Sequence, residues 1–339
     1  MPNGLQLNIP GAQADVAAMQ ASQRAIESAA DQLKTTAAQL FGGTLLGTGA
    51  DAGADFSAQV DAAVRSSNEV VNACARVVGQ ASDDTIAYDR GGFAGVFGKI
   101  ADGYFQKYGD QSDGLAAIAA KNHKNGVDNP WAQMRKDLGY EFCRAESDKN
   151  PYVAGPLKRT DCSLVSDGAA AIVLADVTTA MQAPRAVLFR AAEHVQDFLP
   201  MSKRDILAFE GCALGWKRAF ANSKTSLDDL SFVETHDCFT IAELIEYEAM
   251  GLAKPGQGGD VAMSGETQKD GRLPVNPSGG LKAKGHPIGA TGVSMHVLSA
   301  MQLTGDAGGI QVRDATLGGI FNMGGAAVAN YVSILERIR

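Results

Sequence analysis

The sequence has few of the features that mark membrane, secreted or nucleic-acid-binding proteins. Its longest apolar run covers residues 169–175, far fewer than the ~18–20 residues of a membrane-spanning helix. The N-terminus lacks the basic and apolar pattern of a signal peptide. The net charge of −8 provides no basic field to attract nucleic acid or anionic lipid. We therefore expect a cytoplasmic protein that binds no nucleic acid and does not span a membrane.

Cysteine is also scarce, with five scattered residues and no Cys-x-x-Cys pair. This predicts neither a disulfide framework nor a zinc site, so we expect no bound metal. What the sequence does have is length, because 339 residues exceed the ~250–300 at which a single core stops growing. About two domains are expected. A hydrophobic content of 45% and a charged content of 20% exclude a fibrous or wholly disordered chain.

The first 96 residues differ in composition from the rest of the chain. They contain no Trp or His and are rich in Ala, Gln, Ser and Asp. Large apolar residues recur every seven positions from Met19 to Leu40, and a second helical pattern starts at Asp55. Together they predict an α-helical hairpin over residues 1–96. The glycines of residues 91–98 predict a flexible junction at its end.

Beyond this junction the pattern alternates between β-strands and α-helices, which predicts an α/β layered domain. Residues 100–160 combine tyrosines with many charges and predict a largely helical, loop-rich excursion. The expected strands are 186–194, 230–234, 317–321 and 328–335, and the expected helices are 203–222, 239–251 and 289–304.

One histidine stands among many glycines and prolines. Residues 276–292 contain seven of them around His286, just before a predicted helix. A tight turn can present one ring nitrogen to a substrate while the backbone fixes the other. The alternative, a phosphate-binding loop, does not fit, because the segment matches neither G-x-G-x-x-G nor G-x-x-x-x-G-K-[ST]. We therefore predict a catalytic role for His286.

A second candidate site lies in residues 234–239, which read Glu-Thr-His-Asp-Cys-Phe between a predicted strand and a predicted helix. Such turns lie at the carboxyl edge of a sheet, where α/β proteins place their sites. A helix start favours the thiolate form of a cysteine. With His236 adjacent, this favours a reactive Cys238 over the alternative of a buried structural cysteine.

These two segments resemble the thiolase family, and its sterol-carrier-protein type in particular. The Gly-His-Pro segment with its flanking glycines and the His-Asp-Cys-Phe segment carry the resemblance, which runs over about residues 99–339. It implies an acyltransferase of lipid or fatty acid metabolism that condenses acyl-CoA thioesters or cleaves 3-oxoacyl-CoA. Coenzyme A thioester would be the substrate, with no permanently bound cofactor, and a homo- or hetero-oligomer is expected.

The resemblance also implies a role for each candidate residue. His286 would activate a nucleophilic cysteine and line an oxyanion hole, which His236 would complete. Cys238 would be the acid or base that moves the α-proton of the second acyl group. Ser163, four residues before Asp167, would contact the pantetheine arm of coenzyme A.

The resemblance further implies how the chain is divided. The expected parts are the helical hairpin 1–96, a loop domain 97–165, the last strand of the thiolase N-terminal half with a linker over 166–184, and the C-terminal domain 185–339. The strand itself is expected over residues 166–176. The hairpin would replace most of the N-terminal half. In size and shape it resembles small helical-hairpin substrates of type VII secretion; a generic helical extension or dimerisation arm is the alternative.

The nucleophilic cysteine that thiolases carry in a Cys-x-Ser-Gly turn has no counterpart in this sequence. The only upstream cysteine, Cys74, lies within a predicted helix, where we expect it to pack in the core. Three interpretations stay open: an enzyme whose partner chain supplies the nucleophile, a catalytically inactive CoA-binding or scaffold subunit, and a truncated or fused thiolase fragment.

Overall fold

The computed structural model describes residues 91–198 and 204–338, together with five isolated residues near the N-terminus. The chain divides into two units, residues 1–90 and 91–339, and the account below concerns the second. The predicted helical hairpin, its resemblance to secretion substrates and the packing of Cys74 lie outside the described residues.

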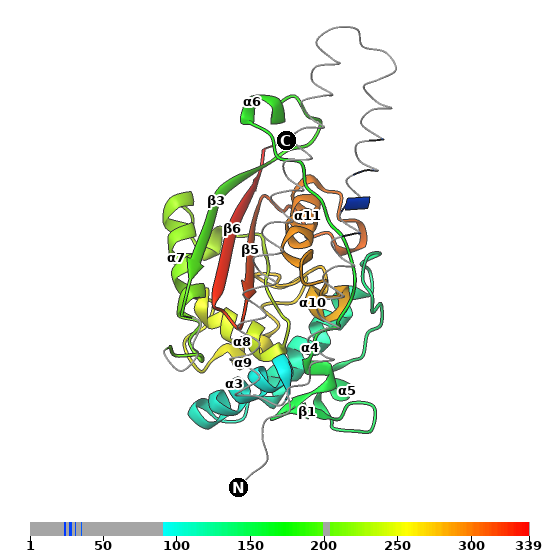
Figure 1. Ribbon diagram of the computed structural model, residues 1–339, viewed down its shortest axis with the longest axis vertical. Coiled ribbons are helices and arrows are strands. Elements are labelled where there is room, and N and C mark those ends of the chain that lie inside the picture. The colour runs from blue at the N-terminus through cyan, green and yellow to red at the C-terminus, as the bar shows by residue number, and fades with distance from the viewer. Residues whose placement is uncertain are drawn as a thin grey trace. The chain divides into compact units, whose positions relative to one another are not determined.

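A four-stranded mixed sheet forms the centre of this unit (Figure 1). Its strands are β3 (Val187–Gln196), β6 (Ala329–Arg337), β5 (Leu317–Gly324) and β4 (Phe232–Glu234), in that spatial order. The β3–β6 and β5–β6 pairs are antiparallel, whereas β4 and β5 are parallel. All four strands lie where the alternation of apolar residues predicts them. A separate hairpin joins β1 (Tyr152–Ala154) and β2 (Leu157–Lys158).

Helices complete the α/β architecture. In the described residues they are α3 (Gly92–Tyr108), α4 (Ser112–Gly126), α5 (Tyr140–Arg144), α6 (Val177–Ala180), α7 (Glu210–Ser223), α8 (Thr240–Ala249), α9 (Gly258–Ser264), α10 (Gly280–Lys284) and α11 (Thr291–Thr304), with short 3-10 turns η1 (Arg159–Asp161), η3 (Leu227–Asp229) and η4 (Gly308–Ile310). Both α8 and α11 match predicted helices. Helix α7 begins later than predicted because Phe209 has a φ of 47°, which an α-helix does not allow. None of the described helices is long and apolar enough to cross a membrane.

Two helices cover opposite faces of the sheet. Gly215 of α7 lies directly over Val332 of β6, while His296 of α11 hydrogen-bonds to the hydroxyl of Ser333 at 3.0 Å. Successive residues of a strand point to opposite faces, so α7 and α11 lie on different sides of β6. Figure 1 shows the same layering. Each face of the sheet is therefore covered in part by a helix, while His194 of β3 and Tyr331 of β6 stay exposed.

The glycines of residues 91–98 do not form the flexible junction that was predicted. Helix α3 begins at Gly92 and runs through the expected domain boundary at residues 96 and 97. At Gly98 an added Cβ would lie 2.9 Å from the Cβ of Ala154 in β1. Gly98 therefore allows a close approach between a helix and a strand, and the two units divide earlier, after residue 90.

Residues 166–176 form no strand, in contrast to the prediction. Their apolar side chains face solvent, with Val173 76% and Leu174 71% exposed. No hydrogen bond of the described structure involves the backbone of residues 167–175. A strand exists only where a neighbouring strand pairs with it, and none of the described strands pairs with this segment.

Candidate active site

His286 lies in the turn between α10 and α11. Its Nδ1 is 2.8 Å from the hydroxyl of Thr291, which itself donates to the carbonyl of Pro287 at 3.0 Å. Because the hydroxyl has one proton and gives it to Pro287, it accepts from Nδ1–H of the histidine. The other ring nitrogen, Nε2, is then unprotonated, which is the state that a general base requires.

His236 lies in the loop between β4 and α8 and faces the first histidine. Its Nδ1 is 2.7 Å from the side-chain oxygen of Asn322 in β5. The His236 and His286 rings meet edge to face, with centroids 5.0 Å apart and an interplanar angle of 88°. Two segments that are 50 residues apart in sequence thus place their imidazoles side by side.

Burial keeps both rings neutral. It lowers the pKa of His236 to about 3, with a further contribution from the charge of His286, and it lowers the pKa of His286 to about 4, with a further contribution from Lys284. Desolvation disfavours the charged imidazolium, and nearby positive charge acts in the same direction. At neutral pH both imidazoles are therefore able to accept a proton.

We expect NMR titration of the imidazole signals to give protonation midpoints of about 4 for His286 and about 3 for His236. The unfolded chain takes up these protons near pH 6.5. The free energy of unfolding therefore decreases as the pH falls from 6.5 toward the folded-state pKa of each histidine, because the unfolded chain binds the proton more readily. Midpoints near 6.5 in the folded protein would contradict the buried, neutral pair.

Cys238 is buried, and its ionisation differs from the prediction. Burial raises the pKa of the Cys238 thiol well above its usual value, and the charges of Glu246 and Asp237 raise it further. The thiol precedes the N-cap of α8, which is Phe239, so it lies outside the first turn. Desolvation and neighbouring carboxylates therefore outweigh the helix dipole, and Cys238 rests as a neutral thiol.

Ser163 lies against the same site. Its backbone N–H donates to the carbonyl of Cys238 at 2.8 Å, and Val165 forms a parallel bridge with His286. One short segment thus contacts both motif segments. The structure thus places the rings of His236 and His286 together, and the backbone of Ser163 beside that of Cys238, two residues from His236.

The other described cysteines do not resemble a catalytic nucleophile. Burial raises the pKa of Cys143 and Cys162 to about 11, and it raises the pKa of the fully buried Cys212 well above the usual value. A nucleophilic thiol needs a lowered pKa or an adjacent base. Among the residues described here, no group of His, Cys, Asp and Glu is arranged to hold a metal ion.

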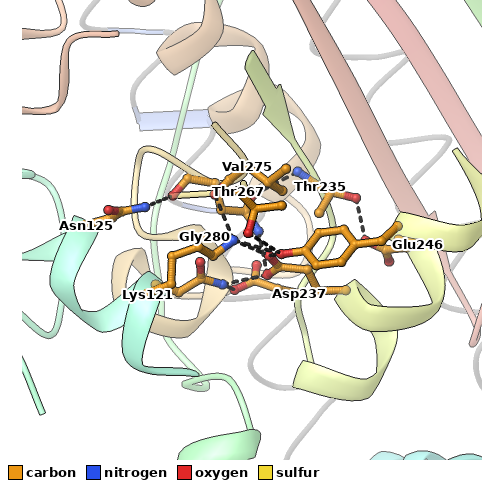
Figure 2. A network of polar contacts seen from close by, with 12 residues as sticks. Lys121, Asn125, Thr235, Asp237, Glu246, Thr267, Val275 and Gly280 are labelled. Atoms are coloured by element: carbon orange, nitrogen blue, oxygen red, sulfur yellow. Dashed lines mark hydrogen bonds and ion pairs between the residues drawn. The ribbon is translucent and has the colours of Figure 1, made fainter. Parts of the chain in front are cut away.

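Sequence reasoning missed a buried polar network beneath the two motifs. Lys121 and Asn122 of α4 both bond to the carboxylate of Glu243, and Asn122 also donates to Asp237 at 2.8 Å. Figure 2 shows Lys121, Asp237 and other members of this network converging from separate segments. The partners are more than 100 residues apart in sequence, so no local pattern could have identified α4 as part of the site.

The fold and this site together define an α/β protein with paired neutral histidines and a buried thiol at one edge of its sheet. Residues 192–337 match the family described as "Thiolase C-terminal domain-like". The "Acetyl-CoA acetyltransferase" of Methanothermobacter thermautotrophicus is 35% identical over 247 residues, which are 72% of this chain and 63% of that protein. The "Sterol carrier protein 2" of Bos taurus is 36% identical over 241 residues, which are 69% of this chain and 44% of that protein.

A solved structure described as "Ltp2-ChsH2(DUF35) aldolase" shares the fold, with a TM-score of 0.63 at 20% identity, covering 72% of this chain and 63% of that one. The matched part of this chain belongs to the thiolase family, in its sterol-carrier-protein type. The resemblance read from the two motifs is therefore confirmed. The chain spans 63% and 44% of the length of the two relatives named above.

Proposed function

We propose that residues 91–339 form the part of a thiolase-type active site that transfers protons to and from acyl-CoA thioesters and stabilises their oxyanion charge. The observation that carries this proposal is the edge-to-face pair of neutral imidazoles, 5.0 Å between centroids, with the Cys238 thiol two residues from one of them. A thioester enolate needs a hydrogen-bond donor at its oxygen and an acid or base at its α-carbon. These three side chains provide both.

In the cleavage direction, His286 takes the proton of a nucleophilic thiol. The resulting thiolate attacks the 3-oxo carbon, the bond between C2 and C3 breaks, and its electron pair moves to C2. The neutral thiol of Cys238 then gives its proton to C2, which completes the released acyl-CoA. The raised pKa of Cys238 means that the resting side chain holds the proton that this step requires.

In the observed contact Nδ1 of His236 faces the Asn322 oxygen and donates to it. To serve the oxyanion hole, His236 would carry its proton on Nε2, which requires the Asn322 amide to turn so that its NH2 group donates to Nδ1. An asparagine side chain offers both a donor and an acceptor and so supports either tautomer. Ser163 lies beside Cys238 and would contact the pantetheine arm of the substrate. The coenzyme A thioester is a substrate in this scheme.

We further propose that a partner chain supplies the acyl-carrying cysteine. The raised pKa values of the described cysteines support this proposal, and so does the exposed apolar segment 166–176, with which none of the described strands pairs. The description of the structural neighbour names two components, which agrees with a hetero-oligomer.

The second candidate function is a CoA-binding scaffold without turnover, which the same lack of a suitable nucleophile favours. A truncated or fused fragment is the third interpretation, in line with the partial span of the relatives.

One assay tests the proton chemistry without needing the missing nucleophile. The full-length chain, incubated with acetyl-CoA in D2O, is expected to exchange the α-hydrogens of the acetyl group for deuterium, as followed by NMR. Cys238→Ala should lower the exchange rate by about 10²–10⁴-fold because it removes the acid–base group. The matched control is Cys143→Ala, another buried cysteine that lies in α5.

Coenzyme A binding without exchange would favour the scaffold and overturn the proposed function. Mass spectrometry of the chain after incubation with acetoacetyl-CoA provides the second measurement. We expect no covalent acyl group on the isolated chain. An adduct on any of its cysteines would contradict the need for a partner and establish autonomous catalysis.

A further inference from the structure

Asp237 lies between the two candidate catalytic residues of its motif, yet its carboxylate faces a different segment. We propose that Asp237 is a positioning residue that fixes the separation of His236 and His286, by tying its own loop to the helix that leads to His286. This inference rests on the proposed function, because it concerns the same histidine pair. It assigns no contact with substrate to Asp237.

The carboxylate of Asp237 is fully buried and accepts hydrogen bonds from two separate segments. Its oxygens accept from the backbone N–H groups of Leu281 at 2.6 Å and Lys282 at 3.2 Å, both in α10. The side-chain amide of Asn122 in α4 donates to it at 2.8 Å. Hydrogen bonds to an ionised acceptor are shorter and stronger than neutral ones, so one side chain joins three segments firmly.

Gly280 is shaped to receive this carboxylate. A Cβ added at Gly280 would lie 2.3 Å from one carboxylate oxygen of Asp237 and 2.5 Å from the other. The φ of Gly280 is +58°, a conformation that other residues rarely adopt. The carboxylate therefore occupies the space of the missing side chain, as Figure 2 shows for these two residues, and the contact admits little lateral movement.

The path from this contact to His286 is short and held at both ends. Helix α10 is five residues long, and only Gly285 separates it from His286. Near its other end, the carbonyls of Ala283 and Lys284 accept backbone hydrogen bonds from Met134 at 3.0 Å and Gln133 at 3.2 Å. Because so few residues separate α10 from His286, we expect a displacement of the loop at Asp237 to move the His286 ring as well.

Holding a carboxylate here has a cost. Burial raises the pKa of Asp237, and the neighbouring Glu243 carboxylate raises it further, so the ionised form of this carboxyl group is costly to hold in the folded protein. A neutral side chain would avoid that desolvation penalty. Each of the two carboxylate oxygens accepts from one backbone N–H group, Leu281 or Lys282. An asparagine would place its oxygen against one of these donors and its NH2 group against the other, so only one donor would be satisfied. The carboxylate is the group that satisfies both.

The test is Asp237→Asn in the full-length chain, compared with Asp161→Asn. Asp161 is equally buried and accepts from Lys158 N–H and the Thr240 hydroxyl, but it accepts no bond from the α10 backbone. The readouts are the NMR signals of the His236 and His286 rings, which the edge-to-face contact shifts, and the kinetics of α-hydrogen exchange. In Asp237→Asn we expect both ring signals to move and kcat to fall by about 10²-fold with KM little changed, as for a small misplacement of catalytic groups.

The control variant should keep the ring signals and the exchange rate of the wild type. Unchanged ring signals in Asp237→Asn, or equal changes in both variants, would overturn the positioning role. Should Asp237→Asn not fold, Gly280→Ala displaces the carboxylate from the opposite side and is expected to move the same two signals. Absence of exchange in the wild type would count against the proposed function alone, because the ring signals report the positioning independently.

Discussion

Replacement of His286 by alanine is expected to abolish whatever thiolysis of acetoacetyl-CoA the full-length chain and its partner support. The same imidazole would activate the nucleophile and line the oxyanion hole, and losing one such role costs about 10²–10³-fold or more in kcat. We expect a combined loss of at least ~10³-fold, measured as the decrease of the substrate enolate absorbance. The Thr291 contact at 2.8 Å holds the His286 ring by Nδ1 and so fixes the direction in which Nε2 points.

The matched control is His194→Ala. His194 lies on β3, is exposed, and stacks on Tyr331 with ring centroids 4.6 Å apart. Because it lies outside the candidate site, its removal should leave kcat and KM close to those of the wild type. Wild-type turnover in His286→Ala would remove the central assignment of the active site.

Replacement of Lys121 by methionine is expected to destabilise residues 91–339 more than any change at the surface. The ammonium group is buried, bonds to the carboxylate of Glu243, and donates to the Tyr247 hydroxyl at 3.0 Å and the Val275 carbonyl at 2.9 Å. Removing one partner of a buried ion pair leaves an uncompensated charge and costs about 3–5 kcal/mol. Urea unfolding followed by tryptophan fluorescence measures this, because both tryptophans of the chain lie in this unit.

Lys107→Met serves as the control for that measurement. Lys107 forms an exposed ion pair with Asp205 at 3.7 Å, and such pairs contribute little to stability. A double variant, Lys121→Met with Glu243→Leu, should recover part of the loss because it removes the orphaned charge. Equal midpoints of unfolding for the Lys121 and Lys107 variants would contradict the importance of the buried pair.

The candidate catalytic residues could be selected from sequence because their signals are local. His286 lies in a turn whose glycines and prolines are its chain neighbours, and Cys238 lies where a strand gives way to a helix. The polar network beneath them gave no such signal. Lys121 and Asn122 have the sequence pattern of ordinary helix residues, because the carboxylates that they contact come from α8 and from the loop before it.

Three expectations failed for one shared reason, which is that each depended on what lies beside the segment in space. The glycines near residue 95 predict a flexible junction, but in the structure Gly98 lies within a helix and allows that helix to approach Ala154 closely. Residues 166–176 have the sequence pattern of a strand, but no strand in the described part of the chain pairs with them. Cys238 read as an activated thiol, but burial near Glu246 raises its pKa.

The sequence by itself therefore determined the family and the α/β class and indicated the residues that we propose to carry the chemistry, because turns, helix starts and apolar periodicity are properties of adjacent residues. Only the tertiary structure decided the protonation of the histidines and of Cys238, and the route by which Asp237 joins the two motifs. Desolvation and hydrogen bonding act through space, and they depend on segments that the folded chain brings together from far apart in the sequence.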